Sequence, residues 1–428
     1  MPVITNIDDL KQIHRRRVPK MFYDYAESGS WTEQTFRENS SDFAQIRLKQ
    51  RVAIDMTGRN LATTMIGQQV AMPVGLAPVG LTGMQCADGE IKAARAAEKF
   101  GVPFTLSTMS ICSIEDVAEN TEKPFWFQVY TLKDDDFMQR LFDRAKAANC
   151  SAAMITVDLQ MLGQRHKDLR NGLSAPPKLT VRSVANMMTK VQWGLGMLGT
   201  KRRFFGNIVG HAKGVTDPSS LSAWTAEAFD QALDWDRIRV FRRMWDGPLI
   251  IKGIMDVRDA REALNVGADA IIVSNHGGRQ LDGALSAIRA LPEIVEAVGD
   301  RIEVHFDSGI RSGQDVLRAV ALGARGTMIG RAFLYGLGAI KNVGSEAIAN
   351  LIEEREKNGK FKSLMDFLRR VNPKDINKLQ LEGLVKAGAF DNLNSNRQSL
   401  FNSIPNFITK SKNIFENKAA NQIDLFGD

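Results

Sequence analysis

A nine-residue segment, SNHGGRQLD from Ser274 to Asp282, combines residue types that can transfer a proton and bind an anion. The His276 imidazole can act as a general base because its ordinary pKa lies near neutral pH. The Arg279 guanidinium presents a planar set of donors that suits a carboxylate. The apolar run AIIV comes directly before the segment. We therefore expect a base and an anion-binding cation at the end of a buried strand.

Eight short apolar runs recur along the chain, and amphipathic helical patterns follow most of them. Such alternation indicates βα units, and parallel apolar strands need cover on both faces. We therefore predict an α/β fold, a (β/α)8 TIM barrel preceded by an N-terminal helical segment. An open doubly wound sheet would require a GxGxxG fingerprint after its first strand, and the sequence has none there. The runs begin at Met72, Val102, Phe125, Ala152, Pro248, Asp269, Ile302 and Arg325.

Residues suited to chemistry follow every predicted strand at its C-terminal end, where the active sites of TIM barrels lie. Each one alone is more readily explained as a loop residue, but eight groups at equivalent positions favour a common site. In chain order they are Pro78 with Gly80, Ser107 with Thr108, Gln128 with Tyr130, Thr156 with Asp158, Lys252, His276 with Arg279, Asp307 with Arg311, and Gly330 with Arg331.

These segments resemble the FMN-dependent α-hydroxy-acid oxidases and dehydrogenases, and within that family the bacterial L-lactate dehydrogenases. The resemblance covers about residues 1–339. It implies an FMN cofactor, no metal, and oxidation of an L-2-hydroxy acid, with L-lactate to pyruvate as the expected reaction. It also implies a homotetramer. The segments that carry it are SNHGGRQLD, IIKGI, FDSGIRSG, IGRAF, FQVY and TVDLQMLGQRHKDLRNG.

The resemblance also implies a role for each site residue. His276 is expected to be the base and Asp158 the carboxylate that holds its imidazolium. Arg165 and Arg279 are expected to bind the substrate carboxylate, with hydrogen bonds from Tyr25 and Tyr130. The expected flavin contacts are Lys252 near the N1 edge, Ala77, Pro78, Ser107, Gln128 and Thr156 along the ring, Asp307 on the ribityl hydroxyls, and Gly309, Arg311, Gly330 and Arg331 at the phosphate.

The spacing between strand ends becomes much longer after the fourth strand, where 94 positions separate Asp158 from Lys252. We therefore predict an insert over residues 169–234. Between Leu169 and Thr216 there are eight Lys or Arg and no Asp or Glu, with aromatic residues and methionines between them. This composition favours contact with an anionic membrane surface, as the membrane-bound members of the family make at this place. A solvated loop or a loop that covers the substrate is the alternative. Nucleic acid is a less favoured ligand, because no repeat suited to its phosphates accompanies the charge.

The composition changes again near residue 340. The first 340 residues contain 10 asparagines and 30 glycines, whereas the last 88 contain 13 and 5. Residues 341–428 resemble a helical piece of the α subunit of bacterial DNA polymerase III, without a polymerase active site. We therefore predict a gene fusion, in which the helical pattern SEAIANLIEEREKNG replaces the helix that normally closes the barrel. The rival hypothesis is an inactive fusion product whose tail binds nucleic acid weakly.

The three cysteines, Cys86, Cys112 and Cys150, are far apart in the sequence and form no CxxC pair. This spacing is typical of a protein in a reducing compartment. No run of about 18 apolar residues occurs, and the N-terminal residues lack the apolar centre of a signal peptide. We expect a cytoplasmic protein attached peripherally to the cytoplasmic face of the inner membrane.

Overall fold

The computed structural model describes residues 4–173, 180–215, 220, 224 and 227–339, and parts of 354–419. The chain divides into two compact units, Met1–Ala339 and Ile340–Asp428.

The first unit is built around a barrel of eight parallel strands, which confirms the predicted fold class. Seven neighbouring pairs share parallel ladders in the order β3-β10-β9-β8-β7-β6-β5-β4. The last pair, β3 and β4, is joined by one isolated bridge between Leu76 and Phe104. The strands are β3 (Val74–Leu76), β4 (Thr105–Ser107), β5 (Trp126–Tyr130), β6 (Ala152–Thr156), β7 (Leu249–Ile254), β8 (Ala270–Val273), β9 (Glu303–Phe306) and β10 (Gly326–Ile329).

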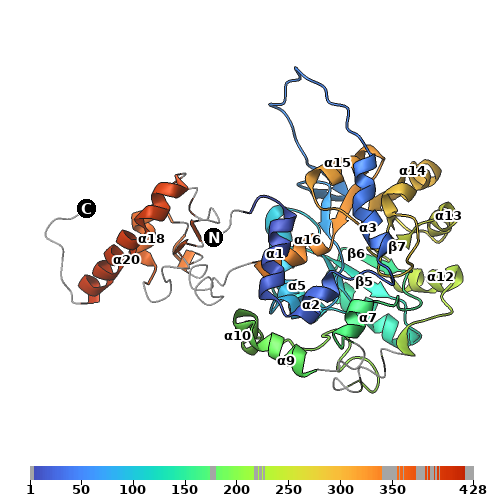
Figure 1. Cartoon of the computed structure of the whole chain (residues 1–428), viewed down its shortest axis with the longest axis horizontal. Coiled ribbons are helices and arrows are strands. Elements are labelled where there is room, and N and C mark those ends of the chain that lie inside the picture. Colours follow the sequence, from blue (N-terminus) through green and yellow to red (C-terminus); the bar gives the residue numbers. More distant parts are fainter. Residues whose placement is uncertain are drawn as a thin grey trace. The chain divides into compact units, whose positions relative to one another are not determined.

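A helix follows each strand and covers the outside of the barrel (Figure 1). Their first turns are capped as the sequence allows: Asp134 accepts a hydrogen bond from the Phe137 N–H, and Ser312 accepts one from Asp315. Apolar side chains between strands and helices form the main core. The helices are α5 (Gly89–Phe100, after the short α4, Thr82–Gln85), α6 (Ile114–Ala118), α7 (Asp135–Ala147), α12 (Trp235–Met244), α13 (Val257–Asn265), α14 (Ala287–Val298), α15 (Gly313–Ala321) and α16 (Arg331–Ala339).

A β-hairpin closes the N-terminal end of the barrel. Its strands, β1 (Thr63–Met65) and β2 (Gln68–Val70), place Met65 in the same apolar cluster as residues from inside the barrel. The opposite end stays open to the loops that follow the strands. Because the hairpin closes one end, the space in the barrel that a ligand can reach lies at the C-terminal strand ends.

N-terminal helices lie beside the last barrel helix (Figure 1). Helix α1 packs so closely against α16 that a Cβ atom added at Gly338 would lie 2.0 Å from the His14 ring. The segment then crosses toward the strand ends, where Ser30 N–H donates to the Gly278 carbonyl at 2.9 Å. These elements are α1 (Ile7–Arg17), α2 (Lys20–Ala26), α3 (Gln34–Ser41) and the 3-10 turn η1 (Asp42–Gln45).

The insert after β6 contains three described helices, α8 (His166–Arg170), α9 (Val181–Met188) and α10 (Val191–Gly199). Its later part is fixed to the barrel by the buried Asn207. The Asn207 carboxamide accepts from the Ile114 N–H at 2.9 Å and donates to Ser110 Oγ at 3.0 Å. The insert is therefore anchored beside the end of β4. Residues 174–179, and several between 216 and 226, lie outside the described part of the chain.

The second unit has a small apolar core of its own, formed by residues that include Phe367, Val385 and Ile404. Its two longest described helices are α18 (Leu364–Arg370) and α20 (Arg397–Ala419). The helix expected in SEAIANLIEEREKNG falls mostly on residues that the structure does not describe.

Strand register brings the predicted site residues side by side at the C-terminal end of the barrel. Ser107 pairs with Gln128, Tyr130 with Thr156, and Thr156 with Lys252. Predicted site residues that lie side by side therefore come from neighbouring strands, although up to 96 positions separate them in the sequence.

Candidate active site

A pocket opens at the C-terminal strand ends. The empty space among its lining residues is about 760 Å³, open solvent at the mouth included. It lies where the barrel fold places catalytic groups. The predicted residues that line it are Tyr25, Ala77, Pro78, Tyr130, Lys252, His276, Arg279, Asp307, Gly309, Arg311, Gly330 and Arg331.

His276 and Asp158 form a close pair at this end of the barrel. His276 Nδ1 lies 2.8 Å from Asp158 Oδ1. The His276 backbone is left-handed, with φ of 57°, a conformation that is costly for a residue with a side chain and typical of functional sites. Gly253 on β7 makes room for the carboxylate, because a Cβ atom there would lie 2.8 Å from Asp158 Cβ.

The charges of this pair follow from its surroundings. Burial lowers the pKa of His276 below its ordinary 6.5, although the Asp158 carboxylate opposes the shift. Burial would raise the pKa of Asp158, but His276 and Lys252 outweigh it and hold that pKa below its ordinary value. At neutral pH the imidazole is therefore neutral and the carboxylate ionised. Because an ionised carboxylate only accepts, His276 Nδ1 donates to it, and Nε2 is left able to accept a proton.

Lys252 projects from β7 into the pocket as a buried cation. Its Nζ lies 3.2 Å from Asp307 Oδ2 and donates to Ser274 Oγ at 2.9 Å. Burial would lower the pKa of Lys252, but Asp307 and Asp158 outweigh this effect and raise it. Lys252 therefore keeps its charge inside the barrel.

Three arginines bring positive charge to the pocket. Burial lowers the pKa of Arg279, Arg311 and Arg331, and for Arg331 burial and the other two arginines together bring the pKa to about 9. Among the described residues, their hydrogen bonds go mainly to carbonyls, such as Arg331 Nε to Ala26 O at 2.7 Å and Arg311 Nη1 to Ile310 O at 2.8 Å. Such a cluster fits an anionic ligand.

Gly309 stands beside Arg311 in a position that excludes a side chain. Its φ is 105°, and an added Cβ would lie 1.9 Å from the Asn39 carbonyl oxygen. The close approach of α3 to the loop after β9 therefore requires glycine here. Gly309 itself lines the pocket.

Two buried polar groups on β5 and β6 have no hydrogen-bond partner among the described residues. They are the Gln128 side-chain amide nitrogen and the Thr156 hydroxyl. Ser107 Oγ donates to Gln128 Oε1 at 2.8 Å, which fixes the carboxamide with its nitrogen directed elsewhere. Buried polar groups normally have partners, so these two fit a bound polar ring system.

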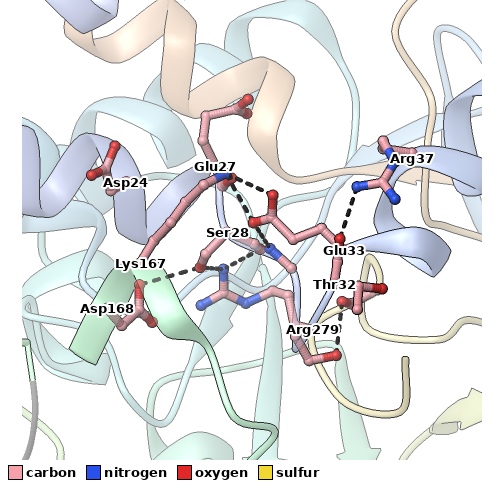
Figure 2. Close-up of polar contacts among 12 residues, drawn as sticks. Asp24, Glu27, Ser28, Thr32, Glu33, Arg37, Lys167, Asp168 and Arg279 are labelled. Carbon is pink, nitrogen blue, oxygen red and sulfur yellow. Dashed lines mark hydrogen bonds and ion pairs between the residues drawn. The ribbon is translucent and has the colours of Figure 1, made fainter. Parts of the chain in front are cut away.

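Arg279 is held against the N-terminal segment by one edge of its guanidinium. Its Nη1 donates to the Tyr25 carbonyl at 2.5 Å and to Ser28 Oγ at 3.1 Å (Figure 2). The guanidinium carbon also lies 4.6 Å from the centre of the Tyr25 ring. The edge that carries Nη2 stays available for a carboxylate.

The remaining predicted residues do not line this pocket. Asp158 reaches it through His276, and Arg165 pairs with Asp168 at 2.7 Å. Ser107, Gln128 and Thr156 are buried at the strand ends. Sequence reasoning missed Ser274, which orders both Lys252 and the His276 N–H, and Ser308, which donates to Asp307. Both lie inside motifs already quoted, so their polar character next to the named residues was the available signal.

The described part of the chain contains neither a metal-binding cluster nor a membrane-spanning helix. No group of three or more His, Cys, Asp or Glu in that part of the chain could hold a metal ion. No described helix is long and apolar enough to span a membrane.

Together, the barrel and its pocket define a cofactor-binding enzyme with a base, an anion cradle and a buried cation. A family model described as FMN-dependent dehydrogenase matches residues 14–358, and the chain belongs to that family. FMN is therefore its cofactor, and the arginine cluster, Gly309 and the unpartnered Gln128 and Thr156 groups fit that molecule.

Relatives of known name support this assignment. The L-lactate dehydrogenase of Ectopseudomonas mendocina (strain ymp) is 45% identical over 354 residues, which cover 82% of this chain and 93% of that protein. The L-lactate dehydrogenase of Caulobacter vibrioides (strain NA1000 / CB15N) is 44% identical over 356 residues, or 82% and 92% of the two chains.

Solved structures show the same fold. The monotopic membrane protein (S)-mandelate dehydrogenase matches with a TM-score of 0.76 and 32% identity, over 86% of this chain and 96% of that one. A mandelate oxidase matches with a TM-score of 0.67 and 33% identity, over 82% and 91%.

Proposed function

We propose that this protein oxidises L-lactate to pyruvate and passes two electrons to FMN. The observation that carries the proposal is the His276–Asp158 pair, which lies in one pocket with Arg279 and Lys252. The identity to named L-lactate dehydrogenases over most of both chains supports lactate as the 2-hydroxy acid.

The residues of this chain divide the work of the reaction. When bound, FMN supplies the acceptor for the α-hydrogen and its bonding electrons. His276 Nε2 takes up the proton of the substrate hydroxyl, and the ionised Asp158 stabilises the imidazolium that results. Loss of that proton and of the α-hydrogen with its electron pair converts the alcohol carbon into the ketone of pyruvate.

Other groups hold the substrate and balance charge. Arg279, with Arg165 behind it, binds the substrate carboxylate. Burial raises the pKa of Tyr130, which therefore remains a neutral phenol that can donate a hydrogen bond. Lys252 keeps its charge in the pocket and offsets negative charge that develops on the cofactor.

Anaerobic reduction of the bound flavin tests the proposed reaction. After anaerobic mixing, L-lactate should bleach the yellow colour of the flavin, whereas D-lactate should leave it unchanged. The reason is that Arg279 binds the substrate carboxylate and His276 the hydroxyl, so that only one enantiomer directs its α-hydrogen to the cofactor. Reduction by NADH, without reduction by any 2-hydroxy acid, would contradict the assignment.

We propose further that the insert attaches the enzyme to an anionic membrane on the cytoplasmic side. Helices α9 and α10 expose large apolar side chains: Val181 is 88% exposed, Met188 76%, Leu195 62% and Leu198 74%. The similar mandelate dehydrogenase structure is titled a monotopic membrane protein. Apolar side chains beside basic ones suit the membrane interface.

In the basic run KRR of the insert, residues 201–203, the two arginines bind other residues of this chain. Arg202 pairs with Asp88 at 3.1 Å and with Asp116 at 2.6 Å, and Arg203 donates to the carbonyls of Met197 and Leu198. Replacing the whole run would therefore disturb the insert itself. Lys201 is exposed and does not share these contacts.

Sedimentation with vesicles tests the membrane proposal, using variants that leave the contacts of Arg202 and Arg203 intact. Replacing Leu195 and Leu198 by serine should release the protein from anionic vesicles without loss of turnover. A matched control replaces the exposed Leu317, on α15, by serine and should still sediment. Equal sedimentation of both variants would refute the proposal.

We propose that residues 341–428 are a fused segment, similar to a piece of DNA polymerase III α, that takes no part in the reaction. The family model extends to residue 358, so the first 18 residues of this segment lie inside the family match and only residues 359–428 lie beyond it. What supports a passenger role is that the residues lining the pocket lie between Tyr25 and Leu334. Deletion of residues 360–428 should leave flavin content and turnover unchanged, and loss of the flavin would contradict this. A salt-sensitive shift of DNA mobility by the full chain, absent after the deletion, would favour the nucleic-acid alternative.

The oligomeric state is a separate proposal. We propose a homotetramer by analogy with the family, and light scattering of the flavin-bound protein tests it. A mass of one or two chains would contradict it.

A further inference from the structure

Asp168 is a buried carboxylate outside the set of residues to which the reaction has been assigned. It is 4% exposed and lies in the first turn of α8, three residues after Arg165. Its Oδ2 accepts from Arg165 Nε at 2.7 Å, and its Oδ1 lies 3.2 Å from Ser28 Oγ. The carboxylate thus connects the segment after β6 with the N-terminal segment.

Ser28 continues this connection to the second arginine. It is fully buried, and its Oγ lies 3.1 Å from Arg279 Nη1 (Figure 2). A hydroxyl has one proton to donate, and an ionised carboxylate is a stronger acceptor than the Tyr25 carbonyl that lies at the same distance. Ser28 therefore donates to Asp168 and accepts from Arg279. The result is a continuous path from Arg165 through Asp168 and Ser28 to Arg279.

The path holds each guanidinium by one side only. Arg165 uses Nε, and Arg279 uses Nη1, in the hydrogen bonds found among the described residues. Burial and, after it, the charge of Arg165 lower the pKa of Arg279, and the charge of Asp168 opposes them. A carboxylate between two like charges lets both remain near one ligand.

We propose that Asp168 is a positioning residue, which orients Arg165 directly and Arg279 through Ser28 so that their remaining donors bind the carboxylate of the 2-hydroxy acid. The inference rests on the proposed function and adds a residue to it. Asp168 itself does not line the pocket.

A second ion pair between the same two segments supplies a matched control. Lys167, next to Asp168 in α8, binds Glu33 at 2.8 Å and donates to the Glu27 carbonyl at 3.0 Å. Figure 2 shows both connections between α8 and the N-terminal segment. Glu33 contacts neither arginine in the described structure, and the bond that it accepts from the Gly29 N–H at 3.0 Å can also be accepted by a glutamine oxygen. Glu33→Gln therefore removes the charge of the second ion pair and keeps the groups of Ser28 and Asp168 that form the path.

The test compares Asp168→Asn with Glu33→Gln in the full-length FMN-bound enzyme. The measured quantities are the KM for L-lactate, the inhibition constant of pyruvate, kcat and the flavin content. An amide at residue 168 removes a negative charge, so a simple charge effect would tighten binding of these anions. Loss of a hydrogen bond to a charged group would instead weaken binding about tenfold to a hundredfold.

We expect Asp168→Asn to raise both constants by about tenfold or more, with full flavin content and a smaller change in kcat. Glu33→Gln should leave both constants within about twofold. Unchanged or tighter binding in Asp168→Asn, or an equal rise in Glu33→Gln, would overturn the inference.

Ser28→Ala keeps the test decisive if Asp168→Asn does not fold. It removes one hydroxyl and leaves the Asp168–Arg165 pair intact, so both constants should rise, but by less than in Asp168→Asn. Unchanged constants would show that Arg279 is not held through Ser28. A wild-type enzyme that neither oxidises 2-hydroxy acids nor binds pyruvate would refute the proposed function, whereas an active wild type with an unaffected Asp168→Asn would refute the positioning role alone.

Discussion

The two ends of the barrel each contain a histidine paired with a carboxylate. At the C-terminal end, His276 Nδ1 lies 2.8 Å from Asp158. At the N-terminal end, His305 Nε2 lies 3.1 Å from Glu303. The residue types and distances are nearly the same, so they do not by themselves distinguish a catalytic pair from a structural one.

The surroundings of the two pairs differ. His276 lines a pocket with Lys252 and Arg279, and its backbone is left-handed. His305 is fully buried, and an added Cβ on Gly326 would lie 3.1 Å from its ring, while Glu303 also accepts the Ile66 N–H of the closing hairpin. We propose that access to a ligand and nearby charges suit the first pair to catalysis, whereas the second pair fastens the hairpin to the barrel.

Asp158→Asn should give the largest effect, because it breaks the pair at the pocket without removing the base. Asparagine can accept from Nδ1 or donate to it, so the imidazole loses both its fixed tautomer and the charge that stabilises its protonated form. We expect the anaerobic rate of flavin reduction to fall by about 10²- to 10⁴-fold. Flavin absorbance before mixing is the control for cofactor binding, and a loss below tenfold would contradict the role.

Lys252→Met removes the buried cation and should impair both reduction and flavin affinity. Its charge opposes that of Asp307 and Asp158 in the folded protein, so its loss leaves two buried carboxylates without their partner. We expect about a hundredfold slower reduction, because one electrostatic donor is lost from the reacting site. Titration of the apoprotein with FMN measures the affinity, and unchanged affinity with unchanged rate would remove Lys252 from the account.

The pH dependence of activity tests the role of the His276 base without a mutation. The base must be neutral to take a proton, and the pKa of His276 lies below 6.5 because of burial. Activity should therefore be level at and above pH 6.5 and fall tenfold per pH unit below the pKa of His276. A fall that begins well above pH 6.5 would show that another group controls the base.

Glu303→Gln should change stability alone. His305 and the Ile66 N–H outweigh burial and hold the pKa of Glu303 below its ordinary value, so the carboxylate stabilises the fold above that ordinary pKa and the contribution is lost as the pH falls through the lowered one. We expect a loss of about 1–3 kcal/mol at neutral pH, measured by urea unfolding, with turnover within about twofold. A large loss of turnover in folded protein would contradict the comparison.

The barrel could be predicted because each strand is a continuous apolar run followed by residues suited to chemistry. Burial on both faces imposes the first property, and the common C-terminal mouth imposes the second. Lys252 and Asp307 could be placed near each other on this basis alone. The weak join between β3 and β4 could not, because hydrogen bonds between strands leave no mark on side-chain type.

Contacts between distant segments limited the rest of the site. Asp168 and Ser28 have ordinary positions in their own segments, and 140 positions separate them. Likewise, the exposed basic run of the insert could not be divided in advance into Arg202, which pairs with Asp88 and Asp116, and Lys201, which is exposed. Composition records charge, but only the folded chain shows which charges are paired.

Anaerobic flavin reduction by L-lactate, measured side by side in His276→Gln and His305→Gln, tests the central claim most directly. Both variants replace a histidine that pairs with a carboxylate, and both are compared at equal flavin content. We predict that His276→Gln is reduced about 10²- to 10⁴-fold more slowly than wild type, while His305→Gln is reduced at nearly the wild-type rate but unfolds more easily. Equal loss of rate in the two variants, or normal reduction of His276→Gln, would contradict the account.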